Sequence, residues 1–255
     1  MKNNYPVTFF AMLYRMKYIE RWGLMRNTEK ENLKEHTFDV ALLAHALCEI
    51  RQAYFPEEQP QPDPGKVVLY AIYHDASEII TGDMPTPVKY FNSQMRTQYS
   101  KVENYAIVHL LNMLPEKLQQ RYAEYFPCDL NNLSNNSNLK QNEIFSTNSV
   151  SSADNSNSVD AEVDVEITEF SEDSLIFEEN YLQKMVKEAD RLAAYIKCII
   201  EIKQGNTEFV DAAEATKAKL INDSSPELQW FLENILPAYQ LNLDQLQVSQ
   251  TEESI

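Results

Sequence analysis

Apolar residues recur at intervals of three and four positions along most of the chain, and this spacing predicts amphipathic α-helices. The first such stretch spans Thr8–Trp22 and carries apolar side chains at Phe9, Leu13, Met16 and Ile19. Further helices are predicted over Ser93–Met113, Glu116–Phe126, Glu178–Lys203, Glu208–Ile221 and Glu227–Leu236. The chain is therefore expected to fold as an all-α protein.

A second helix is expected to begin at Asn32, because Glu35 lies three residues later and the two can form a capping box. The apolar positions that follow His36 at steps of four, three and four are Val40, Leu43 and Leu47. His36 is thus predicted to share the core-facing side of this helix.

A third helix is expected to begin at Asp63, since the next residue is a proline suited to the first helical position. Its apolar pattern continues to about Ile80. The following stretch, Thr81–Phe91, contains one glycine and two prolines, which disrupt helices, and a loop is predicted there.

The composition changes sharply between residues 129 and 160, where asparagine and serine make up 17 of 32 residues. Such a tract buries too little apolar surface to offset the entropy lost on ordering. Residues 129–176 are therefore predicted to be a disordered acidic insertion. It interrupts a single helical domain whose two parts are residues 1–128 and 177–247, and residues 248–255 are predicted to be a flexible tail.

Composition excludes several protein classes. With 4 glycines, the chain contains neither the G-x-x-x-x-G-K-[ST] nor the G-x-G-x-x-G phosphate-binding loop. The cysteines Cys48, Cys128 and Cys198 are widely spaced and are expected to be reduced thiols of a cytoplasmic protein. No signal peptide or membrane span is expected.

The net charge of −17 is unevenly distributed. Residues 129–180 contain twelve acidic residues and one lysine, whereas residues 1–34 contain seven Lys or Arg against three Glu. Physiological salt screens charges over roughly 8–10 Å. The acidic charge elsewhere in the chain therefore does not prevent the basic N-terminal region from receiving an anion. No larger basic stripe is present, so binding of polymeric nucleic acid is not expected.

His74 and Asp75 stand side by side in the apolar stretch VVLYAIYHDASEII, where an imidazole and a carboxylate are costly to desolvate without a compensating charge. His36 and Asp190 occupy similar apolar surroundings. Each signal alone has an ordinary structural explanation, such as a hydrogen-bonded core histidine. Together, two nitrogens and two oxygens indicate a site for one divalent metal ion.

Acidic and hydroxyl side chains follow this pair. On the helix predicted to continue to about Ile80, Glu78 lies four residues after His74 and three after Asp75, so it is expected to share their face, where a carboxylate can orient or deprotonate a metal-bound water. Asp83 and Thr86 lie in the predicted loop, at the helix end where a substrate is expected to enter.

Several motifs carry a resemblance to a known family. They are RWGLMRN at 21–27, EHT at 35–37, YHDASE at 73–78, TGDMPTPVKYFNSQ at 81–94, KEADRLAAYIKC at 187–198 and GNTEF at 205–209. The chain resembles the HD-domain phosphohydrolases, and most closely the bacterial 5′-deoxynucleotidases of the YfbR type. The long loop motif is the most specific, and the resemblance covers nearly everything outside residues 129–176.

The resemblance implies a single HD-domain helical bundle that hydrolyses deoxyribonucleoside 5′-monophosphates and commonly forms a homodimer. It implies one bound divalent metal ion, with cobalt or manganese expected. The implied ligands are His36, His74, Asp75 and Asp190.

The resemblance also assigns substrate and catalytic roles. Glu78 and Asp83 correspond to catalytic or substrate-contacting acids, and Asp83 and Thr86 are expected near the substrate. Arg21 matches a phosphate-binding arginine, and Trp22 matches a tryptophan that crowds the sugar 2′ position. From sequence, either Glu78 or Asp83 can assist departure of the 5′ oxygen.

Two alternatives remain open at this point. One is another HD hydrolase chemistry, acting on nucleoside triphosphates or cyclic nucleotides. The other is a non-catalytic scaffold that recruits a partner through the acidic tract at 129–180.

Overall fold

The computed structural model describes residues 6–89, 91–126, 172–222 and 224–247, and within these ranges the chain is helical without any strand. One isolated antiparallel bridge joins Glu20 to Asn32. The prediction of an all-α protein is therefore confirmed. The predicted insertion up to residue 171 and the predicted tail at 248–255 lie outside the described residues.

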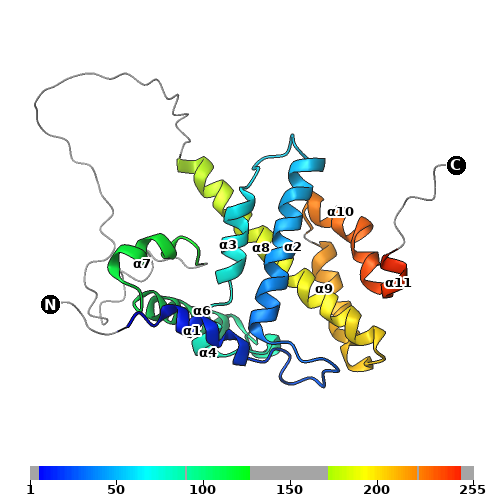
Figure 1. The fold of residues 1–255 in the computed structure, drawn as a ribbon, viewed down its shortest axis with the longest axis horizontal. Helices are drawn as coiled ribbons and strands as arrows, with labels where there is room; N and C mark the ends of the chain where they lie inside the picture. Colours follow the sequence, from blue (N-terminus) through cyan, green and yellow to red (C-terminus); the bar gives the residue numbers. More distant parts are fainter. Residues whose placement is uncertain (1–5, 90, 127–171, 223, 248–255) are drawn as a thin grey trace, which may run out of the picture.

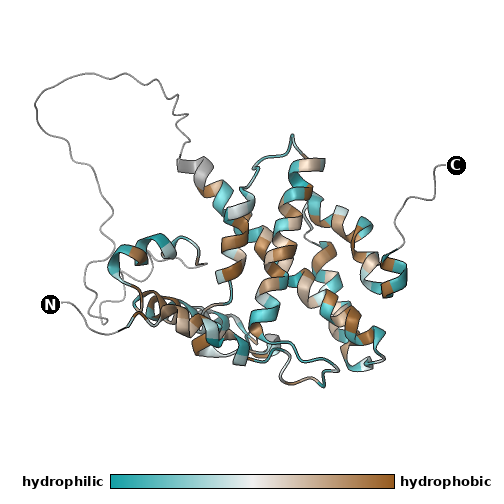
Figure 2. Ribbon diagram, viewed as in Figure 1, coloured by the Kyte–Doolittle hydropathy of each residue, from teal (hydrophilic) through white to brown (hydrophobic). Residues whose placement is uncertain are grey.

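Three helices form the centre of the molecule: α2 (Leu33–Tyr54), α3 (Pro64–Tyr73) and α8 (Glu172–Lys203) (Figure 1). Each packs against the other two. Figure 2 shows apolar residues gathered along these helices, where their interior faces meet. The helices α9 (Val210–Asn222) and α10 (Pro226–Asn234) extend this core by packing against α8 and α2 respectively.

A second apolar cluster joins α1 (Phe9–Leu13), α6 (Ser93–Leu111) and α7 (Glu116–Ala123). Phe9 is fully buried there, with its ring edge-to-face against Tyr122 at 5.4 Å. Tyr73, the last residue of α3, belongs to this second cluster, whereas Tyr70 one turn earlier belongs to the first. The end of α3 is therefore held by both clusters.

Shorter elements complete the fold. They are η1 (Tyr14–Tyr18), α4 (Glu78–Thr81), α5 (Thr86–Lys89), η3 (Thr207–Phe209), η4 (Leu236–Gln240) and α11 (Leu243–Leu246). In the described part of the chain, no helix combines the length and apolarity needed to cross a bilayer.

Two predicted helix starts are confirmed. The Asn32 side chain caps α2 by accepting from the backbone N–H groups of Lys34 and Glu35, and the Glu35 side chain accepts from Asn32 N. Asp63 caps α3 through Lys66 N, with Pro64 as the first helical residue. The buried face of α2 contains His36, as predicted.

Other boundaries were predicted wrongly. The helix expected over Thr8–Trp22 is only α1 followed by the 3₁₀ turn η1, because residues 19–21 leave the helix and pair with residues 31–33. The predicted loop contains the single-turn helix α5, and α8 begins six residues earlier than Glu178.

The helix predicted from Asp63 to about Ile80 is also wrong, since α3 ends at Tyr73. Residues 74–77 form a tighter turn, in which Ala76 N bonds to Tyr73 O and Glu78 N bonds to Asp75 O. These bonds span three residues, as in a 3₁₀ helix. Hydrophobic periodicity does not report this turn, because it depends on where the polar His74–Asp75 pair finds its partners.

A buried ion pair ties α10 to the central helices. Arg51 on α2 is 2% exposed and lies 3.1 Å from Glu227 on α10, which is fully buried. Tyr181 on α8 donates to the other Glu227 oxygen at 2.8 Å. The charges are compensated and hydrogen-bonded, as buried ion pairs need to be.

Candidate metal centre

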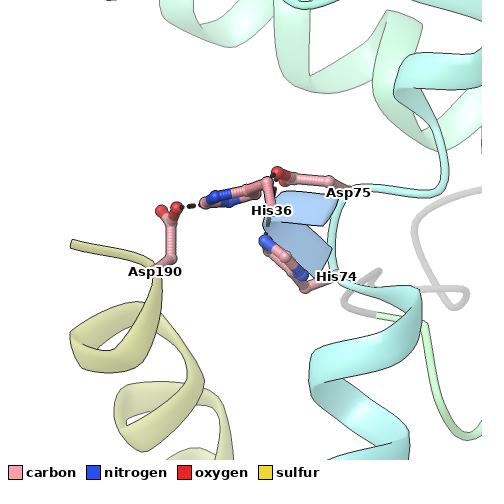
Figure 3. Close-up of side chains that lie close together, drawn as sticks. All are labelled: His36, His74, Asp75 and Asp190. Atoms are coloured by element: carbon pink, nitrogen blue, oxygen red, sulfur yellow. Dashed lines mark ion pairs between the residues drawn. The ribbon is translucent and has the colours of Figure 1, made fainter. Parts of the chain in front are cut away.

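Three segments bring the four predicted metal ligands together. His36 lies in the first turn of α2, His74 and Asp75 directly follow α3, and Asp190 lies in the middle of α8. One nitrogen or oxygen from each side chain lies within 4.8 Å of the others (Figure 3). Atoms bound to one cation at ~2.0–2.2 Å are at most ~4.4 Å apart. The group therefore has nearly the dimensions of a single-ion site.

His36 lies between the two carboxylates (Figure 3). Its Nε2 is 3.1 Å from Asp190 Oδ1 and 3.7 Å from Asp75 Oδ2. His74 Nε2 is 3.0 Å from the same Asp75 oxygen. The His36 side chain is fully buried, whereas 39% of the Asp190 side chain is exposed. The cluster is thus closed on the His36 side and open to water and small molecules at Asp190.

The outer nitrogens of both imidazoles face acceptors. His74 Nδ1 is 2.6 Å from Ala71 O. His36 Nδ1 is 3.1 Å from Glu31 Oε1, at contact distance although not aligned for a hydrogen bond. A proton on each Nδ1 leaves the Nε2 lone pair facing the cluster. Both Nε2 atoms are buried without a hydrogen-bond partner. Two such nitrogens beside two carboxylates fit a divalent cation.

Mutual attraction sets the protonation of the metal-free cluster. Burial opposes ionisation of Asp75, but His74, His36 and Arg21 together outweigh it and hold the pKa of this carboxyl well below its usual range. The pKa of Asp190 is likewise lowered against its burial, chiefly by His36. Burial lowers the pKa of His74, yet Asp75 and Asp190 raise it to about 9. A divalent cation would replace this imidazolium charge, because a histidine ligand must be neutral.

Arg21 lies beside the cluster. Its Nη1 is 3.3 Å from Asp75 Oδ2 and its Nη2 is 4.0 Å from Asp190 Oδ1. Burial lowers the pKa of Arg21, but Asp190, Asp75 and Glu31 outweigh that effect and raise it. The structure therefore places a permanent planar cation next to the predicted metal ligands.

Trp22 adopts a backbone conformation that residues other than glycine rarely take. Its φ is +57°, and among the described residues no other non-glycine residue has a positive φ. The indole Nε1 donates to Glu31 Oε2 at 3.2 Å, and the ring packs against Phe209 with centroids 5.3 Å apart. Trp22 is thereby held next to Arg21.

Glu31 was missed by sequence reasoning. It contacts Arg21, Trp22 and His36, yet in the sequence it is one of several charged residues between positions 26 and 35. No spacing rule separates it from Glu29. Only the pairing of residues 31–33 with residues 19–21 gives Glu31 a distinct position.

Glu78 begins α4 and is 6% exposed, and its Oε2 is buried without a hydrogen-bond partner. Burial, reinforced by the charges of Asp75 and Asp83, raises the pKa of Glu78 to about 9. Asp83 is half-buried in the segment before α5 and acts electrostatically on both Glu78 and Arg21. Thr86 is the first residue of α5, and its side chain lies outside the described part of the structure.

A cavity of about 500 Å³ lies elsewhere, between α8, α9, α10 and η4. None of the residues that line it belongs to the predicted site. The candidate site is therefore identified by the convergence of the four predicted metal ligands and not by this cavity.

A model of the YfbR-like 5′-deoxynucleotidase family matches residues 8–155 and 149–239. A 5′-deoxynucleotidase of Erwinia tasmaniensis is 36% identical over 238 residues, which cover 93% of this chain and 95% of the relative. The 5′-deoxynucleotidase YfbR of Escherichia coli is 35% identical over 241 residues, covering 93% of this chain and 94% of the relative.

Solved structures show the same fold. An HD-domain phosphohydrolase from Listeria innocua superposes with a TM-score of 0.63 at 18% identity, covering 91% of this chain and 88% of that one. A conserved protein of Pyrococcus furiosus gives a TM-score of 0.51 at 16% identity, covering 89% and 97%. The predicted HD-domain fold is confirmed.

Proposed function

The chain belongs to the YfbR-like 5′-deoxynucleotidase family, and we propose that it hydrolyses deoxyribonucleoside 5′-monophosphates to deoxyribonucleosides and phosphate. The observation that carries the proposal is the match to relatives of this activity over 93% of the chain, with both histidines and both aspartates gathered within 4.8 Å.

His36, His74, Asp75 and Asp190 are the proposed metal ligands. When bound, a divalent cation supplies a Lewis acid that activates water at neutral pH and polarises a phosphoryl oxygen. Two imidazole nitrogens and two carboxylate oxygens suit borderline cations, and cobalt or manganese is the proposed activator.

Arg21 is proposed to hold the substrate phosphate. A guanidinium offers paired planar donors that match phosphate oxygens. Its charge is needed locally, because the chain carries −17 overall and its general field repels anions. The adjacent Trp22 is proposed to crowd the sugar 2′ position and so favour deoxyribose, and Asp83 and Thr86 are proposed to contact the substrate.

Glu78 and Asp83 are the proposed acid–base residues. Because burial raises the pKa of Glu78 to about 9, this carboxyl carries a proton at neutral pH in the metal-free chain. It can give that proton to the departing 5′ oxygen, and in its ionised form it can position the attacking water. Asp83 is the alternative donor.

A homodimer in the bacterial cytoplasm is also proposed. Large apolar side chains are exposed on one side of α6 and just before it, at Phe91, Met95, Val102 and Tyr105. Met95, Val102 and Tyr105 are spaced by seven and three residues, which places them on one face of α6, as in a helix–helix contact, and Phe91 precedes the extended N-cap Asn92. The two described cysteines, Cys48 and Cys198, are buried free thiols, which suits a reducing compartment. Sedimentation of the purified chain tests the dimer.

The decisive experiment is phosphate release from a substrate panel with added Co²⁺ or Mn²⁺. Deoxyribonucleoside monophosphates are expected to be hydrolysed in preference to ribonucleotides, triphosphates and cyclic nucleotides. Asp75→Ala is the matched inactive variant, expected to lose metal and hydrolysis together. Turnover of only triphosphates or cyclic nucleotides would overturn the proposal, and full activity of Asp75→Ala would refute the ligand role of that residue.

A further inference from the structure

Glu31 lies where the three proposed functions of the site meet. Its Oε1 is 3.1 Å from His36 Nδ1 and 3.3 Å from Arg21 Nε, and its Oε2 accepts from Trp22 Nε1 at 3.2 Å. We propose that Glu31 is a positioning residue that joins metal binding, phosphate binding and sugar discrimination through one carboxylate. This inference rests on the proposed function, since the roles of its three partners do.

The backbone fixes Glu31 opposite Arg21. Arg21 N donates to Glu31 O at 2.9 Å, and Leu33 N donates to Ile19 O at 2.8 Å. These hydrogen bonds join the two ends of the loop formed by residues 22–30, next to the start of α2. The Glu31 side chain is 12% exposed, so its contacts are made largely out of solvent.

The first consequence concerns the metal ligand His36. Its Nδ1 is buried, and among the described residues Glu31 is the one carboxylate that forms an ion pair with this nitrogen. A carboxylate at Nδ1 selects the tautomer with a free Nε2 lone pair and makes that nitrogen more basic. Loss of such an outer partner typically weakens metal binding by roughly 10–100-fold.

The second consequence concerns Trp22. Its left-handed backbone, with φ +57°, is strained for a tryptophan and persists only where the surroundings hold it. The bond to Glu31 Oε2 and the contact with Phe209 hold the indole. The Trp22 carbonyl oxygen accepts from Asn27 Nδ2 at 3.3 Å and from Met25 N at 2.9 Å. Removing the acceptor at residue 31 frees the indole Nε1.

The two carboxylate oxygens have different partners, because Oε1 contacts His36 and Arg21 while Oε2 accepts from Trp22. A glutamine at this position keeps one acceptor oxygen and loses the negative charge. An alanine loses both. The substitution series therefore separates the electrostatic effect on the metal ligand from the hydrogen bond to the indole.

The experiment uses the full chain with Trp230→Phe, which leaves Trp22 as the single tryptophan of the 2 present. Glu31→Gln and Glu31→Ala are compared with Glu29→Gln, a nearby carboxylate in the same segment that accepts from Gln204 at 2.9 Å. Circular dichroism checks folding, and calorimetry with Mn²⁺ alone measures metal affinity.

Glu31→Gln is expected to weaken Mn²⁺ binding by about 10–100-fold. Glu31→Ala is expected to weaken it as much, to shift the Trp22 emission, and to lower the ratio of kcat/KM for deoxyribonucleotides over ribonucleotides. Glu29→Gln should change none of these. Unchanged Mn²⁺ affinity in both Glu31 variants, together with unchanged Trp22 emission in Glu31→Ala, would overturn the proposal.

Failure of the proposed function can be distinguished from failure of the proposal for Glu31. If the unmodified chain releases no phosphate from deoxyribonucleoside monophosphates, that function fails, while Mn²⁺ affinity and Trp22 emission still decide the role of Glu31. If Glu31→Ala does not fold, the nearly isosteric Glu31→Gln decides it through metal affinity.

Discussion

Replacing Glu78 by glutamine is expected to stabilise the metal-free protein and to make its stability less dependent on pH. Glu78 is 6% exposed, and its pKa rises from an ordinary value of 4.5 to about 9. Burial is the main cause, followed by the charges of Asp75 and Asp83. A neutral amide of similar shape avoids both costs, because it never ionises.

The sign follows from proton linkage. Between the unfolded pKa of 4.5 and the folded pKa of about 9, the folded state holds a proton on Glu78 that the unfolded state has lost. The contribution of Glu78 to stability is therefore fully present below pH 4.5 and is lost as the pH rises toward 9. The slope is about 1.4 kcal/mol per pH unit for one proton.

The difference between Glu78→Gln and the unmodified chain should accordingly grow by about 2 kcal/mol between roughly pH 5.5 and 7.0. The raised pKa of His74 also makes stability fall with pH, but it contributes to both proteins and largely cancels in the difference.

The assay is urea unfolding with a chelator present at both pH values, with the slope against denaturant checked for two-state behaviour. Hydrolysis by Glu78→Gln should fall at the same time, which is the usual relation between a strained functional group and stability. A stability difference that stays constant across this pH range would refute the inferred burial cost of Glu78.

Three further outcomes are expected. Mn²⁺ at about 100 times its Kd should stabilise the unmodified chain by about 2.7 kcal/mol, measured as a raised Tm. Asp190→Ala should lose most of this Tm shift, and an equal shift in the variant would show that Asp190 is not a metal ligand. Trp22→Ala should relax the preference for deoxyribonucleotides over ribonucleotides in a kcat/KM comparison, and unchanged selectivity would assign that role to another residue. Arg51→Ala should lower the free energy of unfolding by about 3–5 kcal/mol, because it leaves the Glu227 charge buried without its cation; a urea midpoint close to that of the unmodified chain would show that Tyr181 alone compensates Glu227.

The site depends on how its elements are held. The end of α3, which His74 and Asp75 directly follow, is fixed by both apolar clusters through Tyr70 and Tyr73. Asp190 comes from the long helix α8, which packs on both α2 and α3. Two of the proposed ligands therefore stand on packed helices and the other two directly follow one, and packed elements hold coordinating groups more accurately than free loops do.

The sequence by itself determined the helical class, the capped starts of α2 and α3, and the identity of the four clustered side chains. These features are local or chemically distinctive. Helix caps follow from two or three neighbouring residues, the inward side of α2 follows from its apolar spacing, and a histidine–aspartate pair in an apolar stretch needs a compensating charge.

Only the tertiary structure decided the rest. These features are the turn at residues 74–77, the extended pairing of residues 19–21 with 31–33, and the position of Glu31 between His36, Arg21 and Trp22. Each depends on contacts that the apolar spacing of a single segment does not encode. Periodicity reports which side of a helix is apolar, but it does not report where the helix must end for its polar residues to meet their partners. Glu29 and Glu31 have the same chemistry and similar neighbours in the chain, and packing alone directs one toward Gln204 and the other into the site.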